Sequence, residues 1–307
     1  MTKHSITVIG ANNVDITATA FTSLIYGDSN PGEVRTGMGG VGRNIAENLA
    51  RLGQEVRFLT VFGDDEFSRI AKEQANRVGI DVSDSLIAAG KSSSVYVCIN
   101  DPNGEMSLAV NDMEIMKSLT TEFLATKLDV INSSQAVVID ANLPQEAIDF
   151  IVQYSVVPVF ADAVSVKKAV RLHQSLPQLT ALKANQIEVE LLTGIHVGSE
   201  DDAVTATQAL HQMGVEHVLL TLGKRGAFVS DGKATESARS LVTHPVNTTG
   251  CGDAFFAASV CAILEGLTCG EILRYGLAGA AVCAESPLSV SERMSMDALQ
   301  AYLKQEE

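Results

Sequence analysis

Long apolar runs are absent from this 307-residue sequence. No stretch approaches the roughly 18 to 20 uninterrupted apolar residues that a helix needs to cross a bilayer. The segment Met1–Gly10 has neither the apolar core nor the processing site of a signal peptide. We therefore expect a cytoplasmic protein without a membrane partner.

Cysteine is scarce, and basic residues are outnumbered by acidic ones. The five cysteines form no C-x-x-C pair, and no histidine is placed to complete a zinc site, so we expect reduced thiols. A formal net charge of −15 argues against polymeric nucleic acid, because phosphate backbones are bound by clustered lysine and arginine. A nucleotide stays compatible, since backbone amides bind phosphate whatever the net charge.

A P-loop is also missing. Gly90-Lys91-Ser92 resembles the end of the G-x-x-x-x-G-K-[ST] motif, but the upstream position is Ser85 instead of glycine. The sequence thus disfavours the P-loop class of kinases.

Short apolar runs rich in β-branched residues alternate with helical patterns along the chain. Such alternation predicts an α/β fold with a mostly parallel sheet covered by helices on both faces. The predicted strands cover Ile6–Ile9, Val56–Phe62, Ala136–Ile139, Pro158–Phe160, Thr180–Leu182 and His217–Leu222. The predicted helices cover Asn44–Leu52, Glu146–Tyr154, Asp201–Gln212, Ala254–Leu264 and Cys269–Glu285.

Two segments interrupt this alternation and predict a small β lid. One is Ile16–Arg35, and the other consists of Ser93–Asn100 and Glu105–Val110, joined by Asp101-Pro102-Asn103-Gly104. Proline second and glycine fourth in that tetrapeptide indicate a tight turn, and the alternating strands fit a sheet with one wet face. We expect lid strands at about residues 16–36 and 93–110 of a single domain spanning residues 1–307.

The segment Asn247-Thr248-Thr249-Gly250-Cys251-Gly252-Asp253 leads directly into an apolar helix. Glycines at a helix start let backbone N–H groups converge on an anion, and the helix dipole adds favourable potential there. Asp253 falls in the first turn, where its carboxylate can accept a proton from an attacking hydroxyl. These features indicate phosphoryl transfer, which needs no protein nucleophile. The simpler interpretation is that Asp253 only complements the helix dipole.

A second glycine cluster, Gly37-Met38-Gly39-Gly40-Val41-Gly42-Arg43-Asn44, also opens a helix. Its spacing matches the dinucleotide fingerprint G-x-G-x-x-G. That fingerprint must follow the first strand of a βαβ unit, however, and here a polar turn comes before it. We favour a site where Gly39 and Gly40 let a polyhydroxylated ligand approach the backbone while Asn44 bonds it.

Two polar residues, Asn13 and Asp15, follow the first predicted strand. Ligands in open α/β sheets bind at the carboxyl ends of strands, and this pair can hold vicinal hydroxyl groups. An Asx turn explains the pair equally well.

Two later motifs also follow predicted strands. Asn185 and Glu188 can supply polar contacts to a nucleotide and organise magnesium, while Thr221, Gly223 and Gly226 can place amides near phosphates. Ordinary helix capping and turn formation are the alternatives.

Taken in order, five motifs resemble the PfkB, or ribokinase-like, family of carbohydrate kinases. They are Asn13-x-Asp15, Gly39-Gly40-x-x-x-Asn44, Asn185-x-x-Glu188, Thr221-x-Gly223-x-x-Gly226 and Thr249-Gly250-x-Gly252-Asp253, and they span nearly the whole chain. The resemblance implies a three-layer α/β/α domain with a β lid that often pairs with a second subunit, hence a homodimer. It also implies ATP and Mg²⁺ as cofactors and a small sugar or nucleoside as substrate.

The resemblance implies roles for individual residues. Asp253 is expected to take the proton of the acceptor 5′-hydroxyl, while the amides of Gly250, Cys251 and Gly252 stabilise the transferring phosphoryl group. The residues expected to bind the sugar are Asn13, Asp15, Gly39, Gly40 and Asn44. The residues expected to bind Mg-ATP are Asn185, Glu188 (which acts on the metal only indirectly), Thr221, Gly223 and Gly226.

Within the family, Asp28–Gly32 and Gly39–Gly53 are similar to bacterial pseudouridine kinases, and Asn111-Asp112-Met113 points the same way. The expected reaction is therefore ATP-dependent 5′-phosphorylation of pseudouridine. Its uracil ring offers two donors and two carbonyls, so Asn30, Asn111 and Asn142 are candidate base-reading residues unless they are ordinary turn or surface residues.

Alternative functions are a kinase for ribose, fructose 6-phosphate or another nucleoside, a non-catalytic sugar- or nucleotide-binding regulator, and an NAD oxidoreductase. A sugar-phosphate substrate needs an extra cationic clamp, and Arg35 and Arg43 are the only arginines near the glycine cluster in the sequence.

Two residues depart from the family pattern. Asn247 stands where many members carry aspartate. The loop beside it, which includes Thr249, is expected to bind a monovalent cation. The replacement removes one negative charge there, so dependence on K⁺ does not follow from the resemblance. Cys251 replaces a small alanine, and a thiol at a helix start can have a depressed pKa. We therefore hypothesise that oxidation or alkylation of Cys251 inhibits the protein.

Overall fold

The computed structural model describes residues 1–242 and 244–304. Its main sheet has eight strands in the order β14-β13-β12-β11-β10-β9-β1-β4. These strands are β1 (Ser5–Ile9), β4 (Glu55–Leu59), β9 (Ala136–Asp140), β10 (Val159–Asp162), β11 (Ala181–Asn185), β12 (His217–Thr221), β13 (Ala227–Ser230) and β14 (Thr235–Ala238). Neighbours from β4 to β12 are parallel, and β13 is antiparallel to both of its neighbours. The predicted mostly parallel sheet is confirmed.

Helices cover both faces of this sheet, because alternate strand residues feed two separate cores. Val138 of β9 packs in one core, and its neighbours Val137 and Ile139 pack in the other. The first core is closed by α1 (Val41–Arg51), α2 (Glu66–Arg77), α9 (Cys251–Leu264), α10 (Cys269–Ala284) and α11 (Met296–Leu303). The second is closed by α3 (Thr121–Ala125), α4 (Leu128–Asn132), α5 (Gln145–Tyr154), α6 (Val166–Ala169), α7 (Gln186–Thr193) and α8 (Glu200–Gln212). In the described part of the chain no helix is long and apolar enough to cross a membrane.

Several strands end elsewhere than the apolar pattern predicts. The predicted strand Val56–Phe62 divides, because β5 (Val61–Phe62) leaves the main sheet to pair with β6 (Leu86–Ile87). The strands β10 and β11 continue past their apolar residues to Asp162 and Asn185. Backbone pairing extends across buried polar residues here, which an apolar pattern does not reveal.

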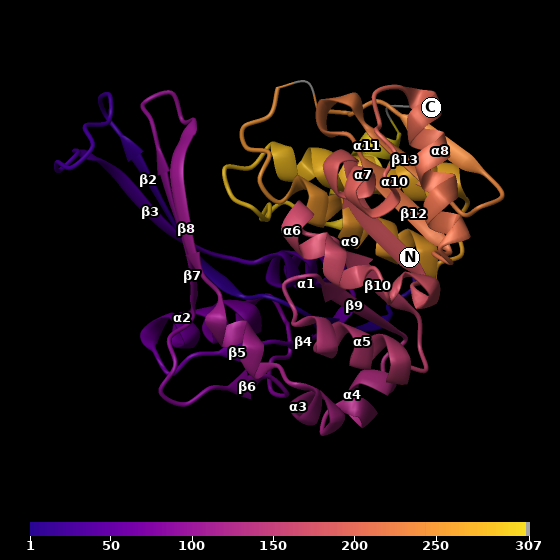
Figure 1. Cartoon of the computed structure of the whole chain (residues 1–307), viewed down its shortest axis with the longest axis horizontal. Helices are drawn as coiled ribbons and strands as arrows, with labels where there is room; N and C mark the ends of the chain where they lie inside the picture. Colours follow the sequence, from indigo (N-terminus) through magenta and orange to yellow (C-terminus); the bar gives the residue numbers. More distant parts are fainter. Residues whose placement is uncertain (243, 305–307) are drawn as a thin grey trace.

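The lid is a separate four-stranded sheet that projects from the main body (Figure 1). Its strands, in the order β3-β2-β7-β8, are β2 (Asn13–Ala20), β3 (Gly32–Gly39), β7 (Ser94–Asn100) and β8 (Met106–Asp112). The predicted hairpin joins β7 to β8, and the Gly104 amide donates to the Asp101 carbonyl at 3.0 Å.

The lid begins earlier than predicted. Asn13 and Asp15 lie in the extended strand β2, so the Asx-turn interpretation is wrong. The glycine cluster runs from β3 into α1, and β3 is a lid strand outside the main parallel sheet. The dinucleotide interpretation therefore lacks the βαβ context that it requires.

Candidate active site

Three buried polar side chains stand side by side at or near the carboxyl ends of the central strands. Asp140 of β9 is in register with Asp162 of β10, which is in register with Lys183 of β11. None of the roles predicted from the sequence falls on these three residues. The available signal was that each one follows a buried apolar run directly.

Asp253 lies in the first turn of α9, buried beside this row. Asn44 of α1, 209 positions away, donates a 2.8 Å hydrogen bond from Nδ2 to Asp253 Oδ2. Burial raises the pKa of Asp253 from 3.8 to about 7, and Asp162 and Asp140 add to the rise, while Lys183 and Asn44 oppose it. A carboxylate with a pKa near 7 is suited to general base catalysis at neutral pH.

The loop before Asp253 has a backbone that only glycine fits at one position. Gly250 is the N-cap of α9 with φ 82°, and a Cβ there would stand 1.9 Å from the Ser289 carbonyl oxygen. The next amide, that of Cys251, makes a long 3.3 Å bond to the Thr248 carbonyl. The first-turn amides of a helix have no partner within the helix, so this loop has the construction of an anion site.

Asp140 fixes the position of α1 relative to the sheet. Its Oδ2 accepts from the amides of Ala11 at 2.9 Å and Gly42 at 2.7 Å, and its Oδ1 accepts from the Asn142 amide at 2.8 Å. These bonds hold the start of α1 beside the end of β1, and they place Asn44 within reach of Asp253.

The predicted sugar-binding residues come together between the lid and α1. Asn13 and Gly39 face each other across the β2–β3 pair, and Gly40 is the N-cap of α1. The Asp15 carboxylate lies against Gly39, where a Cβ would stand 1.8 Å from its oxygen. Among the described residues, Oδ1 of Asn13 and Oδ1 of Asn44 are buried and accept no hydrogen bond. Because buried acceptors are nearly always satisfied, ligand hydroxyl groups fit as their partners.

Two arginines near this cluster are already paired. Arg43 donates to Glu47 at 2.7 Å and to the Met38 carbonyl at 3.0 Å, and Arg35 donates to Glu33 at 3.0 Å. Burial raises the pKa of Asp15 to about 6, and the nearby Arg43 opposes that rise.

The three candidate base-reading residues have different surroundings. The Asn30 side chain closes its own loop, with bonds to the Ile25 amide and carbonyl and to the Asp28 carbonyl, as expected of a turn residue. Asn111 lies opposite Tyr96 on the lid, in the same cross-strand row as Asp15.

The third candidate, Asn142, lies apart from the lid. It is buried just past the end of the central strand β9, and its Oδ1 accepts from the Lys168 ammonium group. Asn111 thus lies on the lid, Asn142 follows a main-sheet strand, and Asn30 is bonded within its own loop.

The predicted nucleotide-binding motifs lie next to each other, since Asn185 of β11 is in register with Thr221 of β12. Asn185 and Glu188 form a capping box at the start of α7, in which both Glu188 oxygens accept from Asn185 at 2.7 and 2.8 Å. Gly223 and Gly226 frame the short 3₁₀ turn η4 (Gly223–Arg225). Across residues 1–242 and 244–304, no three His, Cys, Asp or Glu side chains are grouped to hold a metal ion.

In the predicted cation loop, the Asn247 side chain is already hydrogen-bonded on both sides. Asn247 Nδ2 donates to the Pro287 carbonyl at 3.1 Å, and Asn247 Oδ1 accepts from the Thr249 amide at 2.9 Å. The Cys251 thiol donates to the Asn247 carbonyl at 3.8 Å, and the neighbouring Cys283 thiol lowers the pKa of Cys251.

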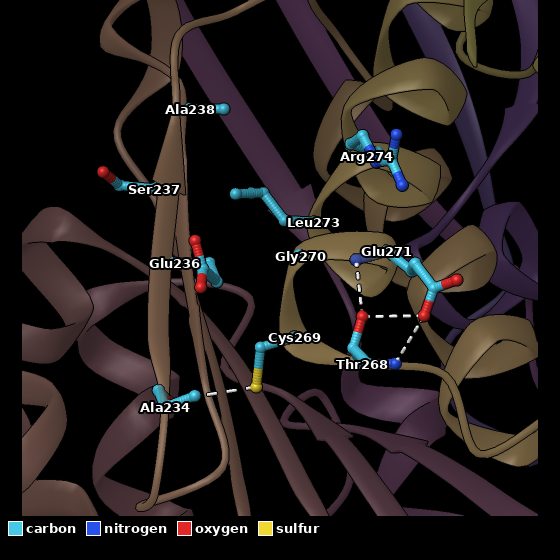
Figure 2. Close-up of a pocket in the computed structure, with 10 residues that line it drawn as sticks. All are labelled: Ala234, Glu236, Ser237, Ala238, Thr268, Cys269, Gly270, Glu271, Leu273 and Arg274. Carbon is cyan, nitrogen blue, oxygen red and sulfur yellow. Dashed lines mark hydrogen bonds between the residues drawn. The ribbon is translucent and has the colours of Figure 1, made fainter. Parts of the chain in front are cut away.

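A separate hollow lies between β14 and the start of α10 (Figure 2). Thr268 and Glu271 in its wall form the capping box of α10, and the Cys269 thiol points to the Ala234 carbonyl. None of the residues predicted to bind ligand lines this hollow.

Comparisons with known proteins identify the family of this chain. The pfkB family carbohydrate kinase pattern matches residues 3–293, and the chain belongs to this family. It is 36% identical to the pseudouridine kinase of Escherichia coli K12, over 89% of this chain and 88% of that protein. An uncharacterised sugar kinase of the same bacterium is 34% identical, over 94% of this chain and 81% of its own. A solved carbohydrate kinase from Agrobacterium tumefaciens superposes with a TM-score of 0.85 at 28% identity, covering 98% of this chain and 97% of that one.

Proposed function

We propose that this protein transfers the γ-phosphoryl group of ATP to the 5′-hydroxyl of a nucleoside, and that the nucleoside is pseudouridine. The observation that carries the proposal is the buried Asp253 carboxylate at the start of α9. It lies beside the Gly250–Gly252 loop and accepts a hydrogen bond from Asn44 of α1. The similarity to a pseudouridine kinase supports the choice of acceptor.

The chemistry follows from the positions of these groups. The acceptor oxygen attacks the γ-phosphorus while its proton passes to the Asp253 carboxylate. The bond from phosphorus to the bridging oxygen breaks, and ADP leaves. The amides of Gly250, Cys251 and Gly252 stabilise charge on the transferring group, which is the main contribution a protein makes to phosphoryl transfer.

The acceptor site suits a neutral polyhydroxylated molecule. The free Oδ1 atoms of Asn13 and Asn44 and the Asp15 carboxylate can accept from ribose hydroxyl groups. Arg35 and Arg43 are engaged with Glu33 and Glu47, so neither is available to clamp a second phosphate. We therefore rank nucleosides above sugar phosphates.

Magnesium would lie near Asn185 and Glu188 and would neutralise charge on the nucleotide phosphates. Both Glu188 oxygens are bonded to Asn185 and the side chain is buried, so Glu188 fits an indirect role through water instead of direct coordination. The neutral Asn247 side chain is bonded to the Pro287 carbonyl and to the Thr249 amide, and the assay below compares turnover with and without K⁺.

We also propose that the lid pairs with a second copy of the chain. Val34 and Leu108 share a cross-strand row, and Val110 lies two residues along β8 on the same face. They are 65%, 53% and 62% exposed, respectively. The opposite face carries Asp15 and Asn111. An exposed apolar face on a projecting sheet marks an interaction surface, and a second copy would cover it while leaving the polar face to the substrate.

The test is an ADP-release assay with Mg-ATP and a panel of pseudouridine, uridine, cytidine, adenosine, ribose and fructose 6-phosphate, with and without K⁺. We expect a strong preference for pseudouridine over uridine. Asp253→Asn should retain ligand binding and lose on the order of a hundredfold or more in turnover. Activity on another acceptor would overturn the proposed acceptor, pseudouridine, and support the proposed phosphoryl transfer. ATP binding with no turnover on any acceptor would favour a non-catalytic regulator.

A further inference from the structure

A buried lysine lies among carboxylates beneath the active-site loop. Lys183 Nζ is 3.0 Å from Asp162 Oδ2, and the two side chains are 9% and 1% exposed. Lysine is rarely buried to this extent unless it is paired. Lys183 lies within β11, in register with Asp162 at the carboxyl end of β10.

The ammonium group of Lys183 reaches the loop that precedes the base. A Cβ on Gly252 would stand 3.0 Å from Lys183 Nζ, so the charge rests against the loop backbone one residue before Asp253. Resting on the proposed role of Asp253, we propose that Lys183 is a positioning residue that keeps Asp253 ionised and adds positive potential under the phosphoryl site. The sequence motifs include no residue with this role.

The charges around Asp253 explain why a cation is needed there. Asp162 faces it from β10 and Asp140 from β9, and both favour its protonated form. Asn44 of α1 donates a hydrogen bond, and Cys251 adjoins it on α9. Lys183 is the cation that opposes the two carboxylates.

Lys183 itself stays protonated in this setting. Burial lowers the pKa of Lys183, but Asp162, Asp253 and, from α7, Glu188 more than compensate, so its pKa is raised overall. Without this cation, three buried carboxyl groups would share one site, and like charges in such a cluster hold a proton.

The inference predicts opposite effects for the two members of the ion pair. In Lys183→Met, Asp253 should protonate more easily, so the acidic limb of the kcat/KM profile should move to higher pH by about one unit or more. In Asp162→Asn the repulsion is gone, and the same limb should move to lower pH. Lys183→Arg keeps the charge and should retain a profile close to that of the unaltered protein.

The experiment measures kcat/KM from pH 5 to 9 for these variants and for Asp253→Asn, with circular dichroism to confirm folding. If Lys183→Met does not fold, the double variant Lys183→Met/Asp162→Asn, which removes the pair without leaving one charge behind, takes its place. Asp162 acts on the pKa of Asp253 more strongly than Lys183 does, so the double variant should have its limb below that of the unaltered protein and above that of Asp162→Asn.

The inference would be overturned if the acidic limb of the kcat/KM profile stayed in place in Lys183→Met and Asp162→Asn. It would also be overturned if the limb moved in the same direction in both variants. Normal turnover in Asp253→Asn would instead overturn the proposed base, so the two failures are distinguishable.

Discussion

Replacing the proposed base should make the protein more stable as well as much slower in turnover. In Asp253→Asn the buried carboxyl group becomes a neutral amide of the same shape, whose oxygen can still accept from Asn44. The folded Asp253 has a pKa of about 7 against 3.8 in an exposed chain. A raised folded pKa means that stability is fully present below pH 3.8 and is lost progressively as the pH rises to about 7.

The size of this effect follows from the difference between the two pKa values. The rise is about three pH units, and each unit corresponds to about 1.4 kcal/mol, so the ionised carboxylate costs about 4 kcal/mol above pH 7. At pH 5 only the first part of the range has been crossed, and the cost is about 1.5 kcal/mol. The amide side chain that Asp253→Asn introduces does not titrate. The free energy of unfolding of Asp253→Asn should therefore gain on that of the unaltered protein by about 1.5 kcal/mol between pH 3.8 and pH 5, and by about 4 kcal/mol once the pH exceeds 7.

The assay is urea unfolding followed by circular dichroism at pH 5, 6, 7 and 8. The exposed Asp64→Asn makes the same chemical change on the surface and serves as the matched control. The reasoning would be refuted if Asp253→Asn were no more stable at pH 8 than the unaltered protein, or if its advantage stayed constant from pH 5 to 8.

Two further predictions concern the thiol in the loop and the lid. Cys251 is half-buried, whereas the other four cysteines are buried. Treatment with an alkylating reagent should inhibit the unaltered protein and leave the turnover of Cys251→Ala unchanged. Unchanged turnover of the unaltered protein after complete labelling at Cys251 would contradict this. Leu108→Glu/Val110→Glu should convert a dimer into a monomer in light scattering, whereas Val156→Glu, at an 80% exposed position outside the lid, should not. A monomeric unaltered protein at micromolar concentration would rule out the lid dimer.

The sequence by itself determined the class of fold and the order of the motifs. Alternating apolar runs are enough to predict a parallel sheet, because strands buried on both faces must be apolar. The turn Asp101–Gly104 and the loop Gly250–Gly252 could also be predicted from the sequence, because proline and glycine restrict or free the local backbone whatever surrounds them. These signals are local, so no partner elsewhere in the chain was needed to find them.

Only the tertiary structure decided which distant residues meet. The contact between Asn44 and Asp253 joins α1 to α9, and the row of Asp140, Asp162 and Lys183 exists because three parallel strands pair in this register. An aspartate or lysine after an apolar run carries no local sign of what lies beside it. Its charge state depends on burial and on neighbours from other elements, and these are set only when the sheet and helices pack together.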